Sequence, residues 1–464
     1  MYKYNNLSDG NVVRQLITFA FPFIISNIIQ TLYSVVDMVI VGQFCGTNSM
    51  SGVNIGGQVT NLVMNVAVGL CAGATILIAQ SVGAGKTKQL QEIIGTLFTS
   101  LCIVSVVMTG LILVFADPIL KLINTPAEAF SEARSFLIVT ALGILFIFGY
   151  NALSAIMRGM GDSKSPLYFV TISCVINIIL DFILVGGLRL GAKGAGIATV
   201  ISQGISLLLC VLYLIKRKFV FDFKLSSFAI RKIQLKAILK IGIPMSVQNF
   251  ITNLSFLFMT ALVNSIGVTA SAAVGAVGKF NGFAILPAIA MSAAISTMCA
   301  QNFGAGKVDR ARKTWLYGMG ISCIMSYMIF ILTVMFPREI LSIFSKDENL
   351  IRMGIPYLKA YSLDYLLIPI TFSMNGLFNG AGHTGFTLIN NMLSGIIVRI
   401  PTAYLLYILL DKELFGVGLA APAAQLSAVI ISLCFFLSGK WKRRTISFEE
   451  EEKKDCLENQ IEVG

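Results

Sequence analysis

The chain has 464 residues, of which 56% are hydrophobic and only 12% are charged. Soluble globular domains carry about 25% charged residues, so this composition excludes a water-soluble globular protein. The net charge of +12 could indicate a nucleic-acid partner, but the basic residues follow a membrane pattern instead, and no nucleic-acid partner is expected.

Apolar stretches long enough to cross a bilayer recur along the whole chain. A transmembrane helix needs about 20 predominantly apolar residues. The polar start lacks the basic region of a signal peptide, so the first stretch is kept as a helix. The sequence therefore predicts an all-α integral membrane protein with 12 transmembrane helices, over residues 15–43, 50–80, 92–115, 131–157, 164–188, 192–216, 238–265, 270–300, 310–336, 354–379, 385–410 and 414–437.

The distribution of lysine and arginine predicts the orientation of these helices. With both termini placed in the cytoplasm, 24 of the 35 basic residues fall on the inner side, 9 on the outer side and two within spans. Cytoplasmic loops of membrane proteins carry such an excess of basic residues. We therefore expect a multi-pass protein of the cell (plasma) membrane with both termini cytoplasmic.

The second half of the chain repeats the first. Residues 80–86 recur as 301–307, and residues 158–161 recur as 379–382, both at an offset of 221. Other matches follow in the same order at an offset of 222. Each copy holds an even number of spans, so both copies enter the membrane from the same side as parallel repeats. Secondary transporters place substrate sites between such repeats, although a duplication can also be merely architectural.

These repeats predict the domain boundaries. We expect an N-terminal six-helix lobe over residues 1–216, a cytoplasmic linker over 217–237, a C-terminal six-helix lobe over 238–437 and a cytoplasmic tail over 438–464. The end of the tail is acidic and too polar to bury a core, so it is expected to be disordered.

One motif resembles a nucleotide-binding loop and is rejected. Residues 83–87 read Gly-Ala-Gly-Lys-Thr, but a phosphate-binding loop needs a glycine where Gln80 stands, after a strand. The nine cysteines form no C-x-x-C pair, and one histidine cannot bind a metal alone. No cofactor and no structural metal are expected.

Two acids at membrane depth in the first half are the principal candidate site. Counted at about 1.5 Å per residue, Asp37 and Asp181 both lie about 10 Å below the outer boundary. Asn177 precedes Asp181 by one helical turn and Thr199 lies at the same depth. Charged side chains inside a membrane are costly and mark ion pathways.

If these side chains converge, they form a coupling site. Two carboxylates in a dry site cannot both stay charged unless one binds a proton or a cation such as sodium lies between them. The alternative is that each acid separately caps backbone or bonds a neighbouring helix, and that Asn177 and Thr199 serve as interhelical contacts.

The second half lacks this set and carries different charges. Arg399 occupies the place of Asn177, and Lys279 and Asp364 share a depth in two helices. A structural ion pair between Lys279 and Asp364 is the first interpretation, a substrate network including Arg399 the second.

The chain resembles the multidrug and toxic compound extrusion (MATE) transporters over residues 10–440. The resemblance rests on Pro22 with Asp37, on the paired motifs at 80–85 and 301–306, and on the segments 158–162, 177–181 and 194–199. It implies two six-helix lobes in a V shape. In one branch of the family, the residues matching Asp37, Asn177, Asp181 and Thr199 form the cation site, and Pro22 matches a proline at which the first helix bends.

The resemblance implies a secondary active transporter, not an enzyme. It would export amphipathic, often cationic, drugs or toxins in exchange for Na⁺ or H⁺ by alternating access. We expect a monomer whose partners are the small-molecule substrate and membrane lipid. The alternatives are a flippase for lipid-linked precursors, which would need a more basic cavity, and a channel or membrane enzyme.

Overall fold

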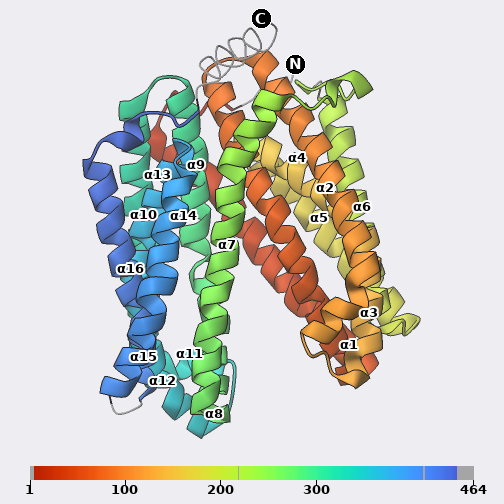
Figure 1. The fold of residues 1–464 in the computed structure, drawn as a ribbon, viewed down its shortest axis with the longest axis vertical. Helices are drawn as coiled ribbons and strands as arrows, with labels where there is room; N and C mark the ends of the chain where they lie inside the picture. Colours follow the sequence, from red (N-terminus) through yellow and green to blue (C-terminus); the bar gives the residue numbers. More distant parts are fainter. Residues whose placement is uncertain (1–4, 218, 411–412, 447–464) are drawn as a thin grey trace, which may run out of the picture. The chain divides into compact units, whose positions relative to one another are not determined.

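The protein is helical throughout the part that the structure describes. The computed structural model describes residues 5–217, 219–410 and 413–446, and no strand occurs within them (Figure 1). The first half contains α1 (Val12–Gly83), α2 (Thr87–Leu122), α3 (Ala127–Leu142), α4 (Ile144–Gly159), α5 (Lys164–Asp181), η1 (Phe182–Gly187), α6 (Gly191–Lys216) and η2 (Leu225–Ser227). The second half contains α7 (Lys232–Ile266), α8 (Val268–Ala284), α9 (Leu286–Gly304), α10 (Val308–Met335), α11 (Pro337–Ser342), α12 (Glu348–Ser362), α13 (Asp364–Gly380), α14 (Thr384–Met392), η3 (Leu393–Val398), α15 (Arg399–Leu409), α16 (Leu414–Leu437) and η4 (Lys440–Lys442).

These helices correspond to the 12 predicted spans. Helix α1 is two helices, because the backbone at Gly46 leaves the helical region with φ 80° and ψ −175°. Several spans are broken, as between α3 and α4, which bend by 54°. Within the described residues, nine helices are long and apolar enough to cross a membrane, or ten if this bent pair is one span. The chain is thus a multi-pass membrane protein.

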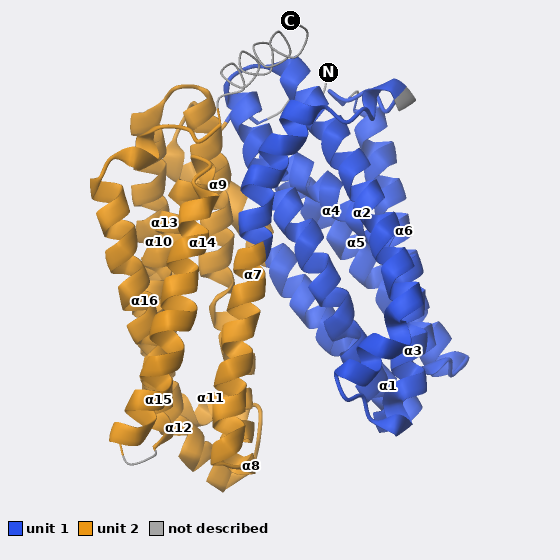
Figure 2. Ribbon diagram, in the orientation of Figure 1, with its two compact units in different colours: residues 1–6, 25–246, 450–464 blue, residues 7–24, 247–449 orange. Residues whose placement is uncertain are grey.

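The chain forms two compact units (Figure 2). Among the described residues, unit 1 contains 5–6 and 25–246 and unit 2 contains 7–24 and 247–446. The first part of α1 therefore belongs to unit 2, and the first part of α7 belongs to unit 1. The two crossing points, after residues 24 and 246, are 222 residues apart, the offset of the sequence repeat. The predicted lobes did not include this exchange.

Contacts with residues far along the chain hold the start of α1 in unit 2. Gln301 accepts a hydrogen bond from the backbone N–H of Leu7 over 2.9 Å, and Arg310 donates to the side chain of Gln15 over 2.9 Å. Leu16 and Phe19 are buried in the hydrophobic core of unit 2. The buried apolar face and these two hydrogen bonds together fix this segment. Burial of an apolar face supplies most of the free energy that stabilises a packed helix.

The start of α7 is held in unit 1 by close backbone packing. A Cβ atom added at Gly73 would lie 2.8 Å from the backbone nitrogen of Gly242. Such a distance leaves no room for a side chain, so glycine permits α7 to approach the second half of α1. Ile238 and Ile241, in the same part of α7, are buried.

The repeated motifs form the same turn in both units. After Gln80, the N–H of Lys86 donates to the carbonyl of Ser81 over 3.0 Å, and the equivalent bond from Lys307 to Asn302 measures 2.8 Å. Gly85 and Gly306 adopt φ of 67° and 73°. Glycine at such a position is the usual end of a helix, since other residues are strained there. The Gly-Ala-Gly-Lys motif is therefore a helix terminus.

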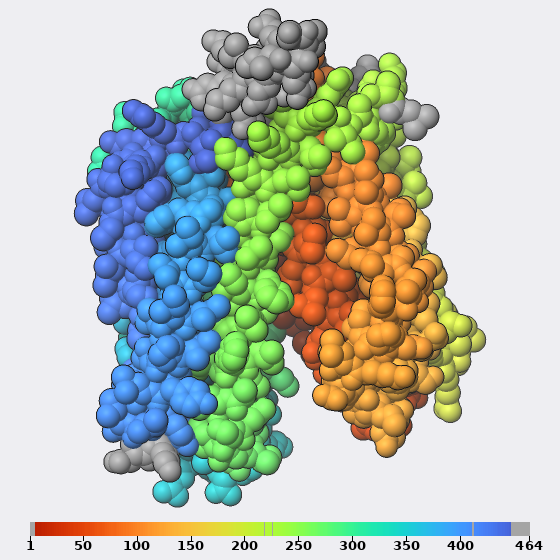
Figure 3. All heavy atoms as spheres, in the orientation of Figure 1, coloured from red at the N-terminus to blue at the C-terminus, as the bar shows by residue number. Residues whose placement is uncertain are grey.

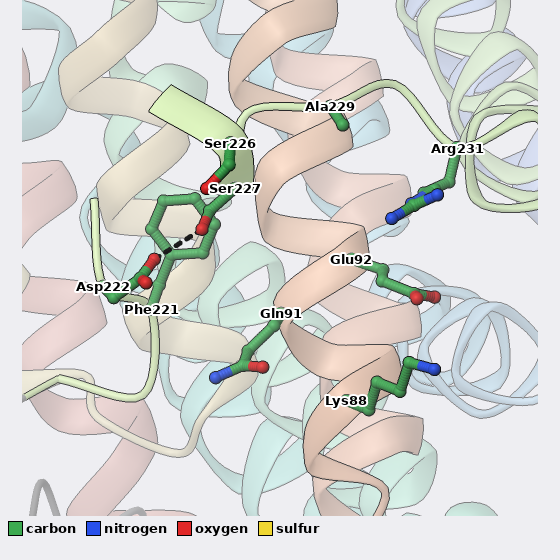
Figure 4. A pocket seen from close by; sticks show the side chains of 9 residues that line it. All are labelled: Lys88, Gln91, Glu92, Phe221, Asp222, Ser226, Ser227, Ala229 and Arg231. Atoms are coloured by element: carbon green, nitrogen blue, oxygen red, sulfur yellow. Dashed lines mark hydrogen bonds between the residues drawn. The ribbon is translucent and has the colours of Figure 1, made fainter. Parts of the chain in front are cut away.

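The linker between the halves packs on α2 and leaves a small crevice of about 230 Å³ (Figure 4). Thr99 donates a hydrogen bond to the carbonyl of Phe228, and Gln91 donates to that of Val220. In the crevice, Ser227 donates a hydrogen bond to Asp222, which holds the pKa of Asp222 below its usual range. The linker is thus an ordered part of unit 1 where the structure describes it.

Candidate functional site in unit 1

Asp37 and Asp181 lie together inside unit 1. Asp181 is fully buried and Asp37 is 8% exposed. Their carboxyl groups are close enough to interact directly. The sequence predicted that the two acids lie at the same depth but left open whether their side chains meet. In the structure the two side chains meet.

The predicted polar partners of the two acids, Asn177 and Thr199, contact each other. Asn177 is buried and donates a hydrogen bond over 3.5 Å to the hydroxyl of Thr199. The Thr199 hydroxyl also lies 3.2 Å from the hydroxyl of Tyr33. These contacts join α1, α5 and α6 into one polar cluster, which contains all four predicted coupling residues.

Sequence reasoning missed Tyr33. Its hydroxyl lies within electrostatic range of both Asp37 and Asp181, and 3.2 Å from the hydroxyl of Thr199. Tyr33 precedes Asp37 by four residues, and residues at that spacing share one face of a helix. That spacing was the available signal, but a tyrosine in a membrane span also occurs without a functional role.

Local structure positions each member of this cluster. Asp181 ends α5, and the wider π-helical turn η1 follows it at once. Such π-turns are rare and are frequent at functional sites. At the start of α6, Glu132 of α3 accepts a hydrogen bond from the backbone N–H of Ala192 over 2.7 Å. This bond fixes the helix that carries Thr199, because an acid stabilises a helix N-terminus.

The cluster has buried oxygens without partners. Both carboxylate oxygens of Asp181, one of Asp37 and the side-chain oxygen of Asn177 find no hydrogen-bond partner in the described chain. No lysine or arginine pairs with either acid among the ion pairs of the described residues. Unpaired buried oxygens are costly, so this arrangement is suited to a proton or a cation.

Unit 2 contains a cavity of about 380 Å³, larger than the crevice of about 230 Å³ beside the linker. Asp364 and Arg399 both line it, and Asp364 is 3% exposed. In the space-filling view, α7, α14 and α16 lie side by side on the face of unit 2 turned to the viewer (Figure 3). Ser255 of α7 donates a hydrogen bond to the carbonyl of Gly395 in η3, which holds that contact.

Lys279 does not join this cavity. Its side chain is exposed, and no ion pair with Asp364 occurs in the described part of the chain. The predicted pair of Lys279 and Asp364 is thus not found, whereas Arg399 does share the cavity with Asp364. Equal depth in two helices fixes only the axial position, and the rotation of the α8 helix turns Lys279 away.

A scan against protein families matches the chain twice. The MatE family model matches residues 22–183 and 244–405, which is more than half of the chain. The chain belongs to the MATE family. The two matches begin 222 residues apart and end 222 residues apart, which confirms the duplication. Members of this family are transporters that use no cofactor, and membership excludes the alternative of a membrane enzyme.

Curated relatives agree with this assignment. The probable multidrug resistance protein YpnP of Bacillus subtilis is 27% identical over 97% of this chain and all of that protein. The probable multidrug resistance protein NorM of Thermotoga maritima is 26% identical over 95% of this chain and 96% of its own length. A relative from Shewanella oneidensis, 24% identical over 94% of this chain and 96% of its own, is named FAD transporter.

Solved structures show the same MATE fold. A crystal structure of MATE in complex with MaD3S matches with a TM-score of 0.88 and 22% identity, over 93% of this chain and 97% of the other. An outward-facing multidrug resistance MATE transporter matches with a TM-score of 0.87 and 22% identity, over 94% and 97%. The predicted 12-helix fold is confirmed.

Proposed function

We propose that this MATE protein exports amphipathic, often cationic, small molecules in exchange for Na⁺ or H⁺ by alternating access. The observation that carries the proposal is the buried contact between Asp37 and Asp181, with unpaired oxygens and no basic partner in the described chain. The names of the Bacillus subtilis and Thermotoga maritima relatives support multidrug substrates.

The chemistry of the site supports ion coupling. Two adjacent carboxylates repel each other strongly when both are charged in a dry environment. A proton on one of them, or a sodium ion between them, removes that repulsion. Asn177, Thr199 and Tyr33 offer an amide oxygen and hydroxyl groups, and hard cations prefer such oxygen ligands. Binding on one side and release on the other would couple export to the ion gradient.

The same proposal includes placement in the membrane. The basic excess on the inner side supports a plasma-membrane protein with cytoplasmic termini. The sequence repeat supports six-helix lobes over 1–216 and 238–437, and the family resemblance supports a bend of the first helix at Pro22. Pro22 lies within α1 and removes a backbone donor from its ladder. We propose a monomer that works in contact with lipid, since many large apolar side chains are exposed on its helices.

Transport in proteoliposomes tests this function. Export of a fluorescent amphipathic cation is measured with a sodium gradient alone, with a proton gradient alone and with neither. We expect export with one gradient and not without it. Equal export under all three conditions would contradict ion coupling, and no export under any of them would contradict the proposed substrate class.

A further inference from the structure

Many polar side chains line the cavity of unit 2, although it lies among helices of a membrane protein. Primary amides from several helices line it, among them Asn249 of α7, Asn281 of α8 and Asn375 of α13. Asn281 and Asn375 are 9% and 6% exposed, and their side-chain oxygens find no partner in the described chain. Buried polar groups without partners are costly, so a cavity of this kind is built to be filled by a hydrogen-bonding ligand.

Two ionisable side chains of opposite sign, Asp364 and Arg399, line this cavity. Asp364 is the first residue of α13, where the predicted span breaks after Leu363, and one of its carboxylate oxygens has no partner in the described chain. Arg399 begins α15 directly after the π-helical turn η3, and its guanidinium lies 4.5 Å above the ring of Phe256. Broken helices at membrane depth are where transporters build binding sites.

Asp364 and Arg399 interact electrostatically but form no direct ion pair in the described residues. Asp364 lies within the electrostatic range of Arg399, yet no ion pair of 4.0 Å or less joins them in the described residues. The Nε atom of Arg399 has no hydrogen-bond partner there. Each charge therefore keeps donors or acceptors available to a third group.

The balance of charge decides the kind of ligand. Guanidinium does not lose its proton in proteins, so Arg399 stays positive, and with Asp364 ionised the two charges sum to zero. A simple cation would pair with Asp364 and leave Arg399 desolvated, and a simple anion would do the reverse. Leaving one buried charge without its partner costs several kcal/mol. A compound that carries both charges satisfies both residues.

We propose that this cavity binds a zwitterionic, hydrogen-bonding organic compound, with its cationic group at Asp364 and its anionic group at Arg399. The proposal rests on the proposed transport function, since it names the substrate class of unit 2. The cavity volume of about 380 Å³ lies within the range of about 300–1,000 Å³ that small-molecule sites occupy. The ring of Phe256 and neighbouring apolar residues offer a surface for the uncharged body of the ligand.

Three probes that differ only in charge test the proposal. Nε-dansyl-lysine is a zwitterion, its methyl ester is a cation, and its Nα-acetyl derivative is an anion. Binding of each to the purified full-length protein is measured by dansyl fluorescence, with no ion gradient. We expect the zwitterion to bind at least tenfold more tightly than either analogue, the change in Kd that about 1.4 kcal/mol produces.

Two variants separate recognition from a structural role. Arg399→Gln should move the preference toward the methyl ester, and Asp364→Asn should move it toward the acetyl derivative. A residue that only stabilised the fold would weaken all three probes alike. Lys279→Gln is the matched control, since Lys279 is charged and exposed in the same unit but does not line the cavity; it should leave the three Kd values unchanged.

If a single neutralisation prevents folding, the double variant Asp364→Asn/Arg399→Gln leaves no lone buried charge and should bind the three probes equally. Failure of the wild-type protein to bind the zwitterion, tightest binding of the ester or the acetyl derivative, or a parallel loss for all probes would overturn the proposal. Because binding is measured without a gradient, these results are independent of ion coupling, which the transport assay tests separately.

Discussion

Asp37→Asn removes one charge of the carboxylate pair while preserving its shape. A cation about 4 Å from a carboxylate gains about 4 kcal/mol at an effective dielectric constant of about 20. The amide oxygen of asparagine can still coordinate the cation and recovers part of this energy. We therefore expect a net loss of about 3 kcal/mol in the free energy of ion binding. That loss corresponds to roughly two orders of magnitude in ion affinity.

The consequence is measured as gradient-driven export in proteoliposomes at matched protein content. Asp37→Asn should nearly abolish export at ion concentrations that saturate the wild-type protein. Asp181→Asn should behave likewise, and the double variant should be little worse than either, because contacting groups act as one site and their effects are not additive. Binding of the dansyl probes to unit 2 should persist in all three variants.

Asp117→Asn provides the matched control. It makes the same chemical change in the same unit, but the ion pair of Asp117 with Arg134 is about half exposed on both sides. Exposed ion pairs contribute little, typically under about 1 kcal/mol, so export should stay normal. Near-normal export by folded Asp37→Asn, or strictly additive losses in the double variant, would refute the argument for a shared coupling site.

Two further predictions concern single groups. Tyr33→Phe deletes the hydroxyl that lies 3.2 Å from that of Thr199; about 1 kcal/mol is lost with such a bond, so ion affinity in the export assay should fall about fivefold, and an unchanged affinity would remove Tyr33 from the site. Gly85→Ala and Gly306→Ala place a side chain at positive φ and should each lower the melting temperature in detergent, at a cost of about 1–2 kcal/mol. Gly320→Ala, in open space within α10, should not lower it, and equal effects at the three positions would contradict the role of φ.

The sequence predicted the helices, the duplication and the depth of the charged side chains. Apolar length defines a span because the bilayer has a fixed thickness, and the helical rise converts residue number into depth. Asp37 and Asp181 could therefore be assigned to one layer from their positions along the chain alone.

Only the tertiary structure decided which side chains at one depth face each other. Rotation about the helix axis is set by packing against neighbouring helices, and a linear count of residues carries no record of it. Packing brings Tyr33 to the two acids and Arg399 to the cavity of Asp364, and it turns Lys279 outward. The exchange of the first parts of α1 and α7 between the units is likewise a property of long-range packing, because both segments are ordinary apolar helices in sequence.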